Sequence, residues 1–135
     1  MSSETVHTSY SFSKTVPMGY EDAIEHVTGV LKKEGFGVLT SIDVRATLKK
    51  KIGADMRPYV ILGACSPQHA YEALQKEREL GLMLQCNVIV YVNDEGKTVV
   101  SAIDPVASMQ AIENPALMDT ALEVQSKMRK VIENL

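Results

Sequence analysis

Hydrophobic and polar positions near the N-terminus follow first a two-residue period, then a helical one. Residues 7–16 alternate and predict a strand with one buried face. In residues 20–34 the apolar side chains recur every three to four positions, which predicts a helix, and Gly35 stands where a left-handed C-terminal cap is expected. Residues 36–42 alternate again and predict a second strand.

A short helix and an apolar strand are predicted next. Asp43 is a suitable N-cap for a helix over residues 44–52, and Gly53 would end that helix. Residues 59–65 are apolar at nearly every position, which is typical of a strand covered on both faces. We therefore expect this run to be the middle strand of the sheet.

A capping residue followed by proline predicts the start of each of three later helices. Ser66 precedes Pro67, and the same signature recurs at Asp104 and at Asn114. The last of these opens a long amphipathic helix over residues 115–135.

A hairpin completes the predicted elements. Residues 87–92 and 98–103 are rich in β-formers and are separated by a polar loop that contains Gly96. A hairpin combined with uneven alternation of strands and helices favours an α+β fold. We expect a mixed or antiparallel sheet of about five strands with helices packed on it.

Length and composition indicate an ordinary globular chain. The 135 residues are 45% hydrophobic and 23% charged, and they contain no repeat or linker-like segment. We therefore interpret residues 1–135 as a single domain in which residues 1–6 are loosely held. The polar N-terminus and the lack of a long apolar run predict a cytoplasmic protein without a membrane segment.

The net charge of -3 gives no basic face of the kind that nucleic acid requires, so we expect no nucleic-acid partner. No phosphate-binding glycine loop, nucleophile elbow or zincin motif is present. The sequence therefore predicts no cofactor, and it does not decide whether the protein is an enzyme.

Several segments together resemble the family called domain of unknown function 302. They are residues 36–40, 42–44, 58–65 and 84–88, and the resemblance extends from about residue 7 to the C-terminus. It implies a small α+β domain with a curved sheet backed by helices, and a homodimer without an agreed activity. The family's cysteine motifs read Cys-Asn-Pro and Leu-Pro-Cys, whereas this chain has Cys65-Ser66-Pro67 and Leu84-Gln85-Cys86.

Cys65 and Cys86 are the candidate catalytic residues. Cys65 ends a strand just before a helix N-terminus, where the helix dipole favours a thiolate, and Cys86 begins a strand that could lie beside it. Two cysteines are too few for a disulfide framework and should be thiols in a reducing cytosol. Alternatively, both are small core residues, because free cysteine is among the most buried residue types.

Ser66 and His69 are candidate ligand-binding residues at the start of the same helix. Cys65, His69 and Cys86 could also be considered as soft metal ligands, but their spacing is too loose to predict a metal site. We therefore predict no metal.

A basic cluster supplies the other candidate ligand-binding residues. Asp43, Arg45 and Lys49 border the short helix over residues 44–52, and the other cationic residues nearby are Lys50, Lys51 and Arg57. An anion could bind there, although consecutive lysines on a short helix are also typical of a solvated face.

Three functions remain open at this point. The first is a homodimeric module that binds a small ligand or regulates a partner. The second is a redox protein or enzyme that uses Cys65 and Cys86. The third is a structural or assembly module whose C-terminal helix forms the partner surface.

Overall fold

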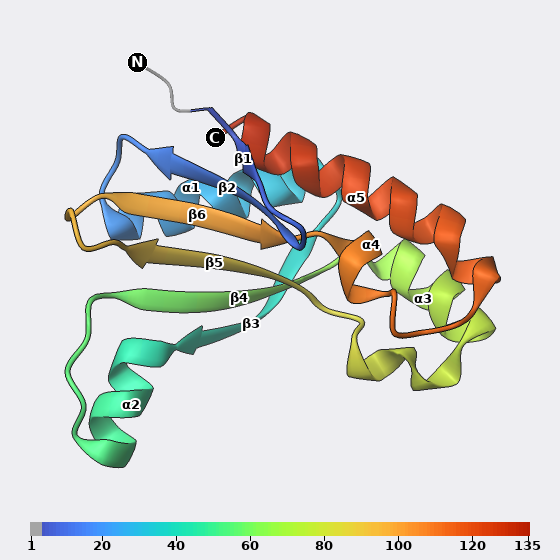
Figure 1. Ribbon diagram of the computed structural model, residues 1–135, viewed down its shortest axis with the longest axis horizontal. Helices are drawn as coiled ribbons and strands as arrows, with labels where there is room; N and C mark the ends of the chain where they lie inside the picture. The colour runs from blue at the N-terminus through green and yellow to red at the C-terminus, as the bar shows by residue number, and fades with distance from the viewer. Residues whose placement is uncertain (1–3) are drawn as a thin grey trace.

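The computed structural model describes residues 4–135, which form one six-stranded sheet with helices packed against it (Figure 1). The strands are β1 (Val6–His7), β2 (Ser11–Val16), β3 (Gly37–Asp43), β4 (Tyr59–Cys65), β5 (Cys86–Val92) and β6 (Thr98–Ile103). Their order across the sheet is β1-β2-β6-β5-β4-β3, and all neighbours are antiparallel. The predicted α+β class with a curved, antiparallel sheet is confirmed. The additional strand arises because the first alternating segment folds into β1 and β2.

The helices are α1 (Tyr20–Lys33), α2 (Val44–Ile52), α3 (Pro67–Lys76), α4 (Pro105–Ser108) and α5 (Met118–Glu133), with 3-10 turns η1 (Arg78–Leu82) and η2 (Pro115–Leu117). The predicted N-caps are confirmed at α2 and α4 but not at α3 or α5. Asp43 accepts a hydrogen bond from the amide of Ala46 at 2.9 Å, and Gly53 ends α2 with a φ of 68°. Asp104 caps α4 in the same way, whereas Asn114 caps only the 3-10 turn η2. The long helix predicted over residues 115–135 instead begins at Met118, without a side-chain cap. Ser66 does not cap α3 with its side chain.

One face of the sheet is covered by α1 and α5. Valines and other apolar residues at alternate positions of the strands point to this face and pack against both helices; the largest fully buried side chains in this core include Leu31, Phe36, Met128 and Ile132. Figure 1 shows α1 behind the sheet, with α5 running along its upper side. Burial of this one face stabilises the fold through the hydrophobic effect.

The opposite face of the sheet carries a second apolar set, and no helix within residues 4–135 covers it. Tyr59 and Tyr91 are opposite each other on β4 and β5, and their rings stack at 5.5 Å. Ile61 and Ile89 form the next pair toward the other end of the strands and are half-buried. Ile42 continues this row onto β3, where it is exposed. We call these five residues the open-face row.

The prediction that residues 59–65 form the middle strand is wrong. β4 lies one strand in from the edge, because the β5–β6 hairpin inserts between β4 and β2. The apolar run is nevertheless explained by burial, since residues 62–65 are all buried. The edge position is taken by β3, which is exposed at nearly every residue.

The expectation that residues 1–6 are loosely held is tested only in part. Residues 1–3, part of the segment expected to be loose, lie outside the described residues, whereas Val6 and His7 pair with β2. Within residues 4–135 no helix is both long and apolar enough to cross a membrane.

Lys14 ties the N-terminal strand β2 to the end of α5. Its side chain is buried on the helix-covered face, and Nζ donates to the carbonyl oxygens of Glu133 and Leu135, at 3.1 Å each. The last carbonyls of a helix have no partner within the helix, and a cation near them also interacts favourably with the helix dipole.

We expect Lys14→Met to destabilise the protein by about 1–3 kcal/mol, because the methionine leaves both carbonyl groups without this donor. Urea unfolding followed by circular dichroism measures the change. Lys130→Met is the matched control, because Lys130 is exposed on α5, and it should change stability by about 0.5 kcal/mol or less. Equal stability of the two variants would contradict the role given to Lys14.

Candidate functional site

A small cavity lies at the end of the sheet where β4 ends, β5 begins and α3 starts. It encloses about 40 Å³. Its wall combines buried thiols, a serine, a histidine and a threonine with apolar side chains from α3, α4, η2 and α5. The lining residues that matter below are Cys65, Ser66, His69, Ala70, Cys86 and Thr120.

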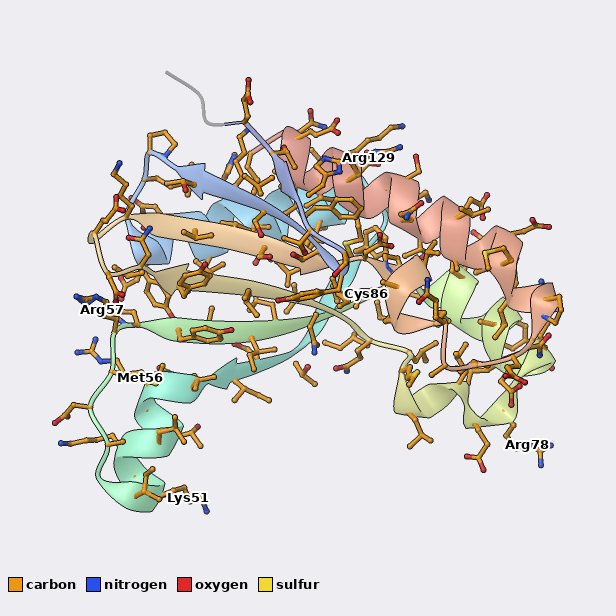
Figure 2. The ribbon with its side chains drawn as sticks, in the orientation of Figure 1. Lys51, Met56, Arg57, Arg78, Cys86 and Arg129 are labelled. Carbon is orange, nitrogen blue, oxygen red and sulfur yellow. The ribbon has the colours of Figure 1, made fainter. Side chains whose placement is uncertain are left out.

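Both cysteines line this wall. Ala64 is directly opposite Cys86 in the β4–β5 pair, so Cys65 is one residue from that position. Both cysteines are buried free thiols. Figure 2 shows Cys86 at the end of the sheet nearest α3 and α4. The pairing therefore brings the two cysteines to the same end of the sheet, with adjacent strand positions facing opposite sides.

Burial controls the acidity of both thiols. It raises the pKa of Cys65 above the ordinary value for cysteine. The pKa of Cys86 is raised to about 11, mainly by burial and also by the nearby charge of Cys65. A thiol with a raised pKa is mostly protonated at neutral pH and is a poor nucleophile. Burial is therefore the main influence on the acidity of both thiols.

A chain of hydrogen bonds joins Ser66, His69 and Glu123 at the edge of the cavity. Ser66 Oγ is 2.7 Å from Nδ1 of His69, and Nε2 of the same ring is 2.9 Å from Oε2 of Glu123. Ser66 is 9% exposed and the His69 side chain 13%, whereas Glu123 is largely in solvent. These hydrogen bonds connect the start of α3 to α5.

These bonds account for the missing cap of α3. The Ser66 hydroxyl is directed to the His69 ring instead of to the backbone, so no side chain caps the helix. The same hydrogen bonds occupy both ring nitrogens of His69, so neither nitrogen is free to bind a metal in this arrangement. Residues 4–135 contain no group of three or more His, Cys, Asp or Glu side chains that could hold a metal ion.

The basic candidates lie elsewhere. Asp43 pairs with Val60 near the start of β4, whereas Ser66 follows the end of that strand. Six residue steps along the strand separate Val60 from Ser66, a distance of roughly 20 Å. Figure 2 shows Lys51 and Arg57 at the end of the molecule opposite Cys86. The structure therefore does not bring Asp43, Arg45 and Lys49 together with Ser66 and His69.

Within the basic cluster, most charges have local partners or face solvent. Lys49 forms an exposed ion pair with Asp55 at 2.8 Å, and Arg57 donates to the carbonyl oxygens of Asn93 and Asp94. Arg45, Lys50 and Lys51 are exposed on α2. Asp43 uses a carboxylate oxygen to cap that helix.

Sequence reasoning missed Glu123 and Thr120. Both lie on α5, more than 50 residues from His69 in the chain, and a single glutamate on an exposed helix face gives no sequence signal. Their relevance arises only from the packing of α5 against α3.

Comparison with known proteins gives the family. The model of the domain of unknown function DUF302 matches residues 12–135. The chain belongs to the DUF302 family. A solved structure, described as the crystal structure of an uncharacterized conserved DUF302 protein from Bacillus stearothermophilus, is 31% identical, with a TM-score of 0.83 over 90% of this chain and 94% of that chain. None of the curated proteins is a significant match to this sequence.

The raised thiol pKa values predict slow alkylation. With a pKa of about 11, Cys86 should react with iodoacetamide at pH 7.5 roughly 300-fold more slowly than a free cysteine, because so little thiolate is present. Cys65 should react faster than Cys86, since only the pKa of Cys86 is raised by a neighbouring charge as well as by burial. Mass spectrometry of peptides from the native protein measures both rates. Alkylation of Cys86 at the rate of the unfolded protein would contradict the burial argument.

Proposed function

We propose that this DUF302 protein is a homodimeric module that binds a small ligand in the cavity beside Cys65 and Ser66. The observation that carries the proposal is the cavity itself, in which polar groups converge on a mostly apolar space. Ligand sites in proteins usually have this composition. The two neighbouring thiols are unbridged, which supports a reducing location such as the cytoplasm.

The size of the cavity limits the ligand. At about 40 Å³ it has room for roughly three water-sized groups, far less than the cavities of about 150 Å³ that admit benzene. A small, mostly apolar group with one or two polar atoms fits this space. Ser66, Thr120 and the thiols supply the polar contacts.

The open-face row supports the dimer. Its five residues, Ile42, Tyr59, Ile61, Ile89 and Tyr91, form an uncharged apolar strip that no helix in the described part of the chain covers. A two-fold dimer places a surface against its own copy, so an uncharged strip avoids repulsion between like charges. A second copy of the chain is therefore the occupant we propose for this face.

The exposed edge around α2 adds to this support. β3 is exposed along nearly its whole length, and α2 has no buried residue. Figure 1 shows α2 projecting away from the sheet. A partner that covers the open-face row at Ile42 would also reach this edge.

A redox function of Cys65 and Cys86 is the second candidate, because both residues line the same cavity. This function requires both thiols to be reachable in the native state. The alkylation rates given above distinguish it from simple packing.

For the ligand site, we expect dissolved xenon to shift the methyl resonances of Ala73 and Ala121, which line the cavity, because xenon enters small apolar cavities. Ala70→Leu should abolish these shifts by filling the space. Ala46→Leu, on the exposed side of α2, is the control and should leave them unchanged. Methyl shifts that are absent, or equal in wild type and Ala70→Leu, would contradict a usable cavity.

For the dimer, we expect Ile42→Lys to produce monomers, because it places two like charges against each other across the two-fold axis. Leu122→Lys is the matched control, because Leu122 is 47% exposed on α5 and Ile42 is 49% exposed on β3. Light scattering after size exclusion gives the mass. Dissociation by Leu122→Lys alone would place the interface on α5, as the assembly hypothesis requires, and a monomeric wild type would rule out the dimer.

A further inference from the structure

The hydrogen-bonded chain at the mouth of the cavity has the parts of a nucleophile, a base and a group that orients the base. Ser66 Oγ contacts Nδ1 of His69 at 2.7 Å, and Nε2 of His69 contacts Glu123 at 2.9 Å. Hydrolases that form an acyl-serine use this order of hydroxyl, imidazole and carboxylate. The three residues come from two elements, α3 and α5, that pack beside the cavity.

The carboxylate determines which nitrogen of His69 is available. An ionised carboxylate only accepts hydrogen bonds, so a neutral ring must carry its hydrogen on Nε2 and donate it to Glu123. Nδ1 then has a free lone pair and accepts the hydroxyl hydrogen of Ser66. The serine proton is therefore already directed to a base.

Backbone amides are available next to the same hydroxyl. The first turn of α3 has amide groups at Gln68 and His69 that no side chain caps. In the described part of the chain, the first backbone bond of this turn is the one from Ala70 to the carbonyl oxygen of Ser66. Uncapped amides at a helix start stabilise a developing oxyanion.

We propose that Ser66, His69 and Glu123 form an acyl-transfer site that hydrolyses small esters with a short acyl group, such as acetyl esters. The inference rests on the proposed ligand site, because the acyl group would occupy the same cavity. The cavity volume of about 40 Å³ restricts the acyl group to about two or three heavy atoms. Ser66 and His69 are the catalytic residues, and Glu123 is a positioning residue.

The reaction balances with the groups present and one water. Ser66 Oγ bonds to the acyl carbon, and the bond from that carbon to the alcohol oxygen breaks. The serine proton passes to Nδ1 of His69 and then to the leaving alcohol. A water oxygen next bonds to the acyl carbon of acetyl-Ser66, and one water proton passes through Nδ1 to Ser66 Oγ as the bond from the acyl carbon to Oγ breaks. Acetic acid leaves with the other water proton, which it loses to solvent to become acetate.

The test uses p-nitrophenyl acetate on the full chain, with mass spectrometry to locate the acetyl group. We expect transient acetylation of Ser66 in the wild type. Ser66→Ala should abolish it, and His69→Gln should slow nitrophenol release at least 100-fold. Ser126→Ala, on α5 outside the chain of hydrogen bonds, is the control and should behave as wild type.

Glu123 needs a separate measurement because it acts through His69. It is 66% exposed, so its replacement should leave the fold intact. Glu123→Ala should lower kcat without changing KM, and Glu123→Asp should recover part of the rate. An unchanged kcat in Glu123→Ala would remove the positioning role.

Acetylation of the wild-type protein tests the proposal by itself. The test therefore remains valid even if a variant fails to fold. Acetylation only on Cys65, on Cys86 or on lysines, with Ser66 unmodified, would rule out the acyl-transfer site. If xenon shifts the methyl resonances of the cavity while Ser66 remains unmodified, the ligand site is supported and the hydrolase inference is wrong. If xenon does not enter and Ser66 is not acetylated, both fall.

Discussion

The antiparallel pairing of β4 with β5 is the constraint on which the rest of the structure depends. With Ala64 opposite Cys86, the register places Val60, Leu62 and Val88 on the face that α1 and α5 cover. A shift of one residue would turn these side chains to the open face and bury the tyrosine pair instead. The same register brings the end of β4 beside the start of β5, where the cavity forms.

The two faces of the sheet have different consequences for the protein. The covered face supplies the hydrophobic core and hence most of the stability. The other face carries Tyr59 and Tyr91 together with three isoleucines, although none of the helices formed by residues 4–135 packs on it. Apolar side chains on an uncovered face contribute little to the monomer but can stabilise an assembly.

The site combines groups that would each be unremarkable alone. Buried thiols such as Cys65 and Cys86 with raised pKa values are ordinary packing residues, and a serine before proline is an ordinary helix start. What distinguishes this site is that the Ser66 hydroxyl turns from the backbone to His69, which is itself held by Glu123. Ser66 and His69 then both line one small, mostly apolar cavity.

The sequence by itself determined the local elements, because their signals act over a few residues. Asp43, Gly53 and Asp104 marked helix ends through caps and backbone conformation, and the apolar periods located α1, α5 and the β5–β6 hairpin. Tertiary structure decided which elements became neighbours. The pairing of β5 with β4 moved residues 59–65 away from the sheet centre, and the packing of α5 against α3 brought Glu123 to His69 across 54 positions of the chain. Such contacts depend on the burial of the whole core, and no local pattern encodes them.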